Sequence, residues 1–332
     1  MARVTDSSGG LNKHRDPREP NRVDCGVIIV TYNSAGDLTR LLASLPLATE
    51  GLRIRTVVVD NASSDDTWDE ILAHDDVLGV SAGANLGYAG AINLGRQYVE
   101  PCDSLLVLNA DLILGPGSVV ALSETLKQCN AGVAVPMILD EQGRLYLSLR
   151  REPTLIRGLG DACFGSRLAA RPGWSSEMIH DRSVYLGAQM VEWASGAALL
   201  ISDGCNRDVG SWDDGRFFLY SEETDFFRRA RLAGHRCVYV PNARVFHRLG
   251  GSGTSPELAA LMAVNRVRYY EKYHHRPASS VFRAVVGLGE MLRVAHPWNR
   301  LAFRTVLRRK SWAKLPGEPR PSRTDLRSDR SG

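Results

Sequence analysis

Residues 23–31 and 53–60 read VDCGVIIVT and RIRTVVVD. Both are short apolar runs without alternating polar residues, a pattern typical of parallel strands that are buried on both faces. Between them, leucines recur at three- and four-residue spacing from Leu38 to Leu45 and predict a helix that ends at Pro46. A strand, a helix and a second strand of these lengths form the elementary unit of a doubly wound α/β sheet.

The same alternation continues along the chain, so we predict an α/β fold with a doubly wound, mostly parallel sheet and flanking helices. Residues 150–185 are rich in Arg, Gly and Pro with weak periodicity and predict a long loop system. From Ser255 onward the pattern is helical and increasingly basic, which predicts a C-terminal helical extension. We further predict strands at 77–81, 103–108, 132–136, 190–202 and 236–240, of which the last ends at Pro241. We predict helices at 68–73, 117–128 and 222–233, and a further helix that ends near Tyr98. Residues 140–143 predict a hairpin.

Composition limits the function classes. The chain has 332 residues, 44% of them hydrophobic, which is enough for one large α/β domain with an added helical region. The formal net charge of +4 is mild, so we expect no nucleic-acid partner. The six cysteines contain no CxxC pair, so we expect reduced thiols rather than a zinc cluster.

No apolar stretch reaches the roughly 18 residues needed to cross a bilayer. Residues 1–22 carry charges throughout and lack the apolar centre of a secretory signal. We therefore predict a cytoplasmic protein that could contact a membrane surface. The predicted organisation is a disordered leader at 1–22, a main domain at 23–250, a helical region at 251–313 and a disordered tail at 314–332.

Polar side chains follow the first two predicted strands. Thr31, Tyr32 and Asn33 end the first strand, and Asp60 and Asn61 end the second. Ligands bind at the carboxyl edge of open α/β sheets, and a carboxylate there can accept a hydrogen bond from the imide N–H of a uracil or thymine ring. A turn that caps the next helix explains Asp60 equally well.

A glycine-rich segment and a short acidic element come next. Asn85, Gly87 and Asn93 belong to GANLGYAGAINLG, where glycines allow close approach of a ligand to the backbone and to a helix N-terminus, although such loops often only turn. Asn109-Ala110-Asp111 follows the strand LLVL, where a carboxylate could hold a hard divalent cation against a diphosphate. An ordinary turn at the strand end is the alternative.

Three acids open a predicted helix after the aromatic run RFFLY. Glu222, Glu223 and Asp225 suit the positive end of a helix dipole, so helix stabilisation alone could explain them. One of them could instead be a general base for an acceptor hydroxyl. His247 follows the last predicted strand, and a neutral imidazole at that edge could complete a metal site, although a lone histidine is more often structural.

The order of these elements resembles the family 2 glycosyltransferases with the GT-A fold, especially bacterial rhamnosyltransferase-like members. The resemblance covers about residues 24–250. It is carried by VIIVTYNS, VVVDNASSDDT, NLGYAGAIN, LNADL, EWASGAALLI and FFLYSEETDFFRRARLAGHRCVYVPNARVFH. The resemblance makes residues 23–250 a GT-A catalytic domain and implies a metal-assisted, inverting transfer of a sugar from a nucleotide donor.

The resemblance also assigns roles to residues. Asp60 matches the aspartate that contacts the pyrimidine base, and Asp111 matches the DxD-like position that binds Mg²⁺ or Mn²⁺ with the diphosphate. His247 matches a metal ligand of some members. Asn109 departs from the family pattern because it stands where the first aspartate of DxD is expected, which implies fewer protein ligands for the metal.

The catalytic base falls on Glu223, the second acid of the family's ED pair. Because the family more often has Asp there, the base could also be Glu222 or Asp225. In the implied mechanism the base removes the acceptor proton while the hydroxyl attacks the anomeric carbon in line. Trp193, Ser195 and Gly196 are candidates for the acceptor floor, and Arg150 and Arg151 for binding a phosphate or, equally, for a solvated surface pair.

The resemblance favours dTDP-rhamnose as donor, with a UDP-sugar as the alternative. The acceptor is expected to be a glycan or a polyprenyl-diphosphate-linked glycan in cell-wall or polysaccharide synthesis. Two rival functions remain: a catalytically silent sugar-nucleotide-binding module, and a nucleotidyltransferase, which would need a lysine in the phosphate loop that TYNSAGD at 31–37 lacks.

Residues 281–315 mix apolar and basic residues at near-helical spacing, with Trp298 and Trp312 as candidate interfacial anchors. This pattern fits a helix on the anionic inner face of the plasma membrane. Packing on the core or on a second subunit of a homodimer fits the apolar stripe as well. Membrane contact would favour a lipid-linked acceptor.

Overall fold

The computed structural model describes residues 22–165, 172–248 and 255–317. The predicted leader and tail lie outside these ranges except for their inner ends, as does the LGGSG segment that follows Arg248. Within the described ranges, no helix has the length and apolar character required to span a bilayer.

Nine strands of the described residues form one mixed sheet, in the order β3-β2-β1-β4-β10-β6-β11-β5, with β8 paired to β11. A separate two-stranded ladder joins β7 to β9. The strands are β1 Cys25–Thr31, β2 Ile54–Asp60, β3 Val77–Ser81, β4 Ser104–Asn109, β5 Leu112–Leu114, β6 Ala131–Leu139, β7 Leu149–Arg150, β8 Gln189–Met190, β9 Trp193–Ala194, β10 Ala198–Ser202 and β11 Arg236–His247.

The sheet is parallel through its first four strands, as the apolar runs predict. The register pairs Thr31 with Asp60 and Val30 with Asn109, so the polar ends of β1, β2 and β4 lie side by side. β10 runs antiparallel between β4 and β6, and β6 pairs in parallel with β11. The fold is therefore a mixed, mostly parallel sheet with flanking helices, which confirms the predicted fold class.

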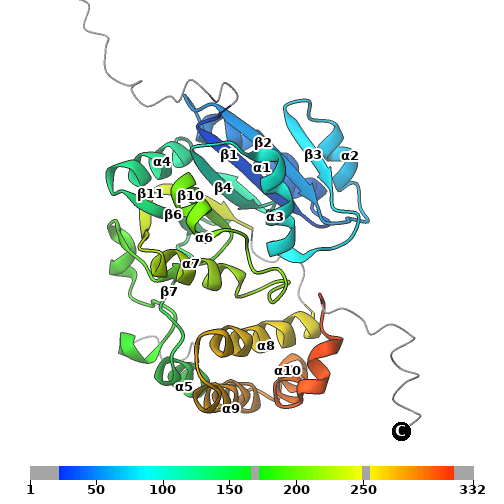
Figure 1. The fold of residues 1–332 in the computed structure, drawn as a ribbon, viewed down its shortest axis with the longest axis vertical. Helices are drawn as coiled ribbons and strands as arrows, with labels where there is room; N and C mark the ends of the chain where they lie inside the picture. The colour runs from blue at the N-terminus through cyan, green and yellow to red at the C-terminus, as the bar shows by residue number, and fades with distance from the viewer. Residues whose placement is uncertain (1–21, 166–171, 249–254, 318–332) are drawn as a thin grey trace, which may run out of the picture.

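Helices cover both faces of the sheet (Figure 1). Alternation along β1 sends Val27 and Ile29 to the core cluster that contains Leu38, and Ile28 to the cluster that contains Ile92. One face is covered by α1 Ala35–Ala48, α2 Thr67–Leu72 and α4 Ser118–Gln128, and the other by α3 Gly87–Val99, α6 Asp203–Val209 and α7 Glu222–Leu232.

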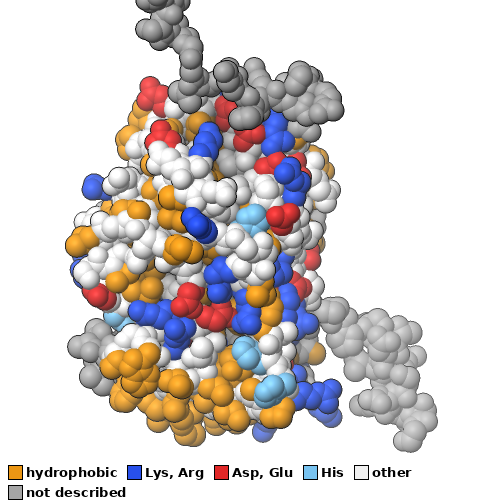
Figure 2. Space-filling model, turned by 60° about the vertical axis from the view of Figure 1, so that its left-hand side comes forward, with side chains coloured by type: hydrophobic (Ala, Val, Ile, Leu, Met, Phe, Trp, Pro, Cys, Tyr) orange, Lys and Arg blue, Asp and Glu red, His pale blue; other side chains and the backbone are white. Residues whose placement is uncertain are grey.

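Four further helices pack at one end of the molecule, below the sheet in Figure 1. α8 Pro256–Tyr273, α9 Arg276–Leu292 and α10 Pro297–Leu307 share a third apolar core, and α5 Leu155–Phe164 packs against α9. Trp312 belongs to this core and donates Nε1–H to the Thr305 carbonyl, so its predicted role as an interfacial anchor is wrong. Figure 2 shows many apolar side chains on the outer surface of this end.

Two prolines do not end their elements as predicted. α1 continues through Pro46 because Leu45 and Ala48 are buried, and their burial offsets the single intrahelical hydrogen bond that proline removes. β11 continues past Pro241 through a register shift between Val240 and Arg244, where the ladder does not require an N–H donor.

Two predicted segments are divided differently. The loop system at 150–185 contains α5, which Thr154 caps by accepting from Arg157 N–H at 3.2 Å. The single strand predicted at 190–202 is three short strands, because the chain leaves the nine-stranded sheet after β8, pairs with β7 through β9 and returns to the sheet at β10.

Candidate active site

A cavity of about 430 Å³ lies where the carboxyl ends of β1 and β4 face the start of α7. Its walls come from segments far apart in sequence, including Leu258 of α8 and Pro316 near the end of the described chain. Twelve of the residues singled out in the sequence line it: Thr31, Tyr32, Asn61, Asn85, Gly87, Asn109, Ala110, Asp111, Ser195, Gly196, Glu222 and Glu223.

Asp60 lies just behind the cavity wall. Its carboxylate accepts from the N–H of Ser63 at 3.2 Å and the hydroxyl of Ser63 at 2.5 Å, and Oδ1 lies 3.4 Å from the Thr31 hydroxyl. Asn33 is exposed and accepts from Ser64 N–H at 2.8 Å. Neither Asp60 nor Asn33 lines the cavity. Asp60 holds the turn through Ser63, as the turn interpretation expects, but it does not cap α2, whose N-cap residue is Asp66.

The glycine-rich loop is fixed by Asn61. The Asn61 amide donates to the Gly87 carbonyl at 2.9 Å and accepts from Leu86 N–H at 3.0 Å. Gly87 has φ +74°, and a methyl group on it would lie 2.0 Å from the Phe218 carbonyl oxygen, so this position requires glycine. The close approach brings Phe218 over the loop and forms part of the cavity wall.

Asn93 faces away from the cavity. Its amide nitrogen donates to the Trp212 carbonyl and its oxygen accepts from the Trp212 N–H, both at 2.9 Å. Both polar atoms of the side chain are therefore used to hold the segment that precedes the aromatic run.

Asp111 and His247 form a pair at one edge of the cavity. Nε2 of His247 lies 3.1 Å from each carboxylate oxygen of Asp111, and Nδ1 is buried without a hydrogen-bond partner. The pair arises because His247 opposes Leu112 in the β11–β5 ladder. A carboxylate and an imidazole so placed could hold a divalent cation. Among the described residues, no group of three or more His, Cys, Asp or Glu side chains is arranged for a metal.

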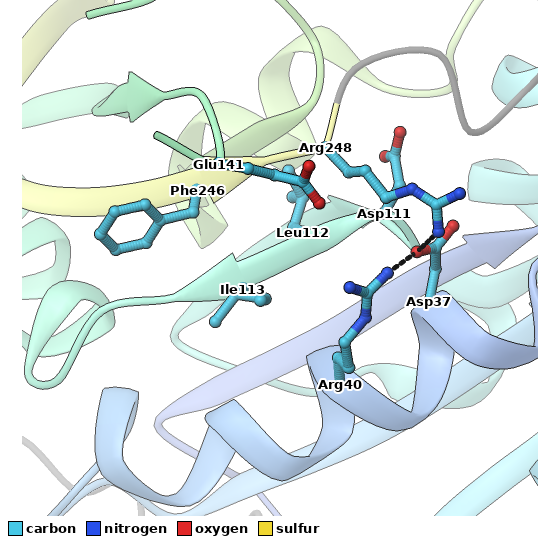
Figure 3. Close-up of a pocket in the computed structure, with 8 residues that line it drawn as sticks. All are labelled: Asp37, Arg40, Asp111, Leu112, Ile113, Glu141, Phe246 and Arg248. Carbon is cyan, nitrogen blue, oxygen red and sulfur yellow. Dashed lines mark hydrogen bonds and ion pairs between the residues drawn. The ribbon is translucent and has the colours of Figure 1, made fainter. Parts of the chain in front are cut away.

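Asp111 also lines a second cavity of about 280 Å³ on its outer side (Figure 3). Arg40 and Arg248 approach the Asp37 carboxylate from two sides, Arg248 at 2.8 Å. These two arginines place positive charge close to Asp111. No motif predicts this cluster, because its members come from α1 and from the residue that follows β11.

Glu222 and Glu223 begin α7 at the cavity floor. Both are enclosed, and the Oε2 atom of each has no hydrogen-bond partner. Burial raises the pKa of Glu222 well above 4.5, and the negative charge of Glu223 raises it further. Burial also raises the pKa of Glu223, while backbone N–H groups and the charge of Arg150 oppose that rise. The two acids thus have increased proton affinity, as a general base requires.

Asp225 is separate from this pair. It is fully buried, and its carboxylate accepts from Lys272 Nζ and the Tyr273 hydroxyl at 2.6 Å each and from Arg229 Nε at 2.7 Å. Because these contacts join α7 to α8 and the side chain does not reach the cavity, Asp225 is a structural anchor rather than a candidate base.

The turn before α7 is strained. Tyr220 and Ser221 both have left-handed backbone conformations, with φ of +70° and +72°. Asn265 of α8, fully buried, donates to the carbonyls of Leu219 and Tyr220 at 2.8 and 3.2 Å. This contact positions the two acids, and no motif in the sequence predicts it.

Tyr88 is a second residue that the sequence analysis missed. Its hydroxyl donates to the Gly196 carbonyl at 3.0 Å, and it lines the cavity. Burial raises its pKa far above 10, and the charges of Glu222, Glu223 and Asp111 raise it further. Tyr88 therefore stays protonated and acts as a hydrogen-bond donor in the floor of the site.

The proposed acceptor residues divide into two groups. Ser195 and Gly196 line the cavity, and a methyl group on Gly196 would lie 3.1 Å from Cβ of Glu223. Trp193 donates Nε1–H to the Arg151 carbonyl at 2.9 Å in the β7–β9 ladder, and neither residue lines the cavity. Arg150 also lies outside the lining, but its charge acts on Glu223.

The chain is similar in sequence to a known family and to individual proteins. Residues 26–175 match the model of the family described as glycosyl transferase family 2. The chain is 34% identical over 257 residues to the N-acetylglucosaminyl-diphospho-decaprenol L-rhamnosyltransferase of Mycobacterium tuberculosis, a match that covers 73% of this chain and 82% of the relative. It is 31% identical over 214 residues to the low-salt glycan biosynthesis hexosyltransferase Agl10 of Haloferax volcanii, covering 63% and 62%.

A solved structure shares the fold. The mannosyltransferase PcManGT from Pyrobaculum calidifontis, in complex with GDP-Man and Mn²⁺, superposes with a TM-score of 0.51 at 16% identity, covering 93% of this chain and 80% of that one. At this identity the likeness concerns the fold alone, which is the GT-A fold.

Proposed function

This chain belongs to glycosyl transferase family 2 and is a glycosyltransferase, and we propose that it is an inverting enzyme that transfers L-rhamnose from dTDP-rhamnose to a hydroxyl of a lipid-linked glycan. The name of the Mycobacterium tuberculosis relative supports this choice of sugar and acceptor. A UDP-sugar remains the alternative donor. Cell-wall or polysaccharide synthesis is the process in which such a transfer would operate.

The proposal rests chiefly on the placement of Glu222 and Glu223. Each has a buried carboxylate oxygen without a partner, and both face the cavity that Asp111 also lines. Buried unpartnered carboxylate atoms are unfavourable unless a ligand completes them. An acceptor hydroxyl that donates to one of them would satisfy this requirement and would be held for deprotonation.

We assign the base to Glu223. The positive charge of Arg150 lowers the pKa of Glu223, whereas the negative charge of Glu223 raises the pKa of Glu222. Glu223 is therefore the more readily ionised of the two. In the proposed step the acceptor O–H proton passes to Glu223 while the acceptor oxygen forms a bond to the anomeric carbon. The bond from that carbon to the diphosphate oxygen breaks with its electron pair, and the configuration inverts.

The residues present fit a divalent cation carried by the donor diphosphate. Asp111 and His247 supply one carboxylate and one imidazole. The Nδ1 atom of His247 is buried and makes no hydrogen bond, so the contact of Nε2 with Asp111 orients the ring. Two protein ligands leave room for phosphate oxygens, as expected for Mg²⁺ or Mn²⁺. When bound, the cation would offset the charge that develops on the departing diphosphate.

The donor base is proposed to lie against the carboxyl ends of β1 and β2. Thr31, Tyr32 and Asn61 line this part of the cavity, and Asp60 lies behind Thr31. For Asp60 to contact a base, its carboxylate must exchange one of its bonds with Ser63 for the imide N–H. The loop carrying Asn85 and Gly87 closes the opposite wall.

The acceptor is proposed to be a glycan linked to a polyprenyl diphosphate. Ser195 and Gly196 beside Glu223 form the floor against which its sugar would rest. Such an acceptor resides in a membrane, so the protein would work in the cytoplasm at the inner face of the plasma membrane.

Transfer assays test the proposal. The purified full-length chain would be incubated with dTDP-rhamnose or a panel of UDP-sugars, a polyprenyl-diphosphate-linked N-acetylglucosamine acceptor, and Mg²⁺ or Mn²⁺. We expect a rhamnosylated product of inverted configuration, formed by the wild type and not by Glu223→Gln. A catalytically silent binding module predicts thermal stabilisation by one nucleotide sugar but no product and no donor hydrolysis in either protein. That result would refute the proposed activity.

A further inference from the structure

The outer face of α9 is apolar from Val281 to Leu292. Val281 is 52% exposed and Leu292 is 56% exposed, although the opposite face of the helix packs on the core through Phe282 and Val286. With 3.6 residues per turn, the outward positions form one continuous stripe. The residues of this stripe are Val281, Ala284, Val285, Leu288, Met291 and Leu292.

Helix α5 widens this stripe into a surface. α5 packs closely on α9, because a methyl group on Gly289 would lie 3.3 Å from Cα of Ala162. Its outward side carries Ile156, 60% exposed, with Leu159 and Phe164, and the neighbouring turn carries Trp174, 65% exposed. We call the stripe of α9 together with these four residues the α5–α9 face. Figure 2 shows apolar side chains gathered at this end of the molecule, with basic side chains beside them.

Positive charge borders the α5–α9 face. Residues 276–314 contain nine arginines and lysines and a single glutamate. Arg276 and Arg283 belong to α9, and they line a cavity of about 500 Å³ together with His274 and the ion pair of Arg309 with Glu271. Ser279 and Ser280 add hydroxyl groups to this cavity. Guanidinium and hydroxyl groups around a concave site are suited to a phosphate group.

This combination favours a bilayer over a second copy of the chain. An isologous dimer would place the same patch, with the same basic border, against itself and would bring like charges together. An anionic bilayer presents phosphate groups to the arginines and acyl chains to the apolar face, and an exposed tryptophan is typical of the interface between them.

We propose that the α5–α9 face and its border of Arg276 and Arg283 dock the protein on the surface of a bilayer that contains anionic phospholipid. The face inserts its apolar side chains at the headgroup level, and the arginines contact lipid phosphates. The proposed function gives this docking its purpose, since a lipid-linked acceptor is presented at such a surface. The docking itself requires neither donor nor acceptor and is tested without them.

Vesicle flotation with the full-length chain tests the proposal. The probes are vesicles of phosphatidylcholine alone and vesicles of phosphatidylcholine with phosphatidylglycerol. We expect the wild type to float with the mixed vesicles and much less with the neutral ones. The double variant Val281→Asp/Leu292→Asp should lose flotation, and Arg276→Gln/Arg283→Gln should bind the mixed vesicles roughly fivefold more weakly for each charge removed.

A matched control is Leu47→Asp/Leu72→Asp, which changes side chains of α1 and α2 that are 61% and 62% exposed. This variant should float like the wild type, and all variants should keep the wild-type melting temperature. Equal flotation of Val281→Asp/Leu292→Asp and wild type would overturn the proposal. A second outcome would also overturn it: light scattering shows that the wild type is a dimer, and Val281→Asp/Leu292→Asp is a monomer that still binds vesicles. Vesicle binding without sugar transfer would refute the proposed function and leave the docking surface standing.

Discussion

The imidazole of His247 lies 3.1 Å from both carboxylate oxygens of Asp111, although 136 positions separate the two residues in sequence. β11 brings them together, because its last residue pairs with the strand that begins directly after Asp111. The buried Nδ1 of His247 makes no hydrogen bond, and the ring packs edge-on against Tyr146, so Asp111 is the hydrogen-bond partner that orients the imidazole. This pair is the basis of the first prediction.

Asp111→Asn and His247→Gln should each weaken the metal-dependent binding of dTDP. Each substitution removes one of the two protein ligands of the metal. The loss of a group that only supports a metal ligand lowers affinity roughly 10- to 100-fold, so we expect the affinity for dTDP with metal to fall by at least that factor. Calorimetric titration of dTDP with and without Mn²⁺ measures it. Equal metal enhancement in both variants and in the wild type would contradict the assignment.

Glu223→Gln should lower the transfer rate by about 10²- to 10⁴-fold, the usual contribution of a general base, and leave dTDP affinity unchanged. Glu222→Gln should retain more activity, because its carboxyl is the more strongly protonated of the two. Initial rates at saturating substrate measure both effects. If Glu222→Gln is the less active variant, the base is Glu222.

The stability of the protein should depend on pH through Glu222. Its folded-state pKa is raised above the ordinary 4.5, so as pH rises beyond 4.5 the unfolded state ionises first and the wild type loses stability. Glu222→Gln does not ionise, so it should unfold at higher denaturant than the wild type at neutral pH and at nearly the same denaturant below pH 4.5. Urea unfolding at both pH values checks this, and a pH-independent difference would indicate a packing effect.

Gly87→Ala should destabilise the protein and disturb donor binding. A positive φ costs a non-glycine residue about 1–2 kcal/mol, and contact with the Phe218 carbonyl adds about 1–3 kcal/mol. Gly83→Ala is the matched control, since Gly83 has φ +69° and a methyl group on it would have no atom within 4 Å. The difference between the two unfolding free energies isolates the contact with Phe218. Equal losses would mean that the loop moves without cost.

Asn265→Ala should remove the support of the strained turn before Glu222. Two carbonyls lose their donor, so we expect a loss of about 1–3 kcal/mol in unfolding free energy together with a lower transfer rate. The control is Asn299→Ala on α10. It removes an amide that donates to the Glu290 carboxylate of α9 at 2.7 Å. It should leave the transfer rate unchanged. A full rate in Asn265→Ala would show that the turn holds its conformation by other contacts.

Local pattern was sufficient for most of the sheet. The apolar runs at β1 and β2 have no polar alternation because both faces are covered, and their ends predict the adjacent positions of Thr31 and Asp60. The pattern failed where burial outweighs local preference, as at Pro46 inside α1. It also failed for α5, where Gly158 packs on α9 and Gly160 on Ser175, because glycines weaken the helical signal in the sequence.

Sequence patterns were enough to predict the family, the carboxyl edge of the sheet as the site, and the polar residues that follow each strand, because strand direction and register are set by hydrophobic pattern over short distances. Tertiary structure alone decided which acids face the cavity. Glu222, Glu223 and Asp225 share one helical turn, and only the packing of Lys272 and Tyr273 from α8 removes Asp225 from the site. Contacts between residues far apart in the chain leave no periodic trace in sequence, so the roles of Asn265 and Tyr88 became visible only in three dimensions.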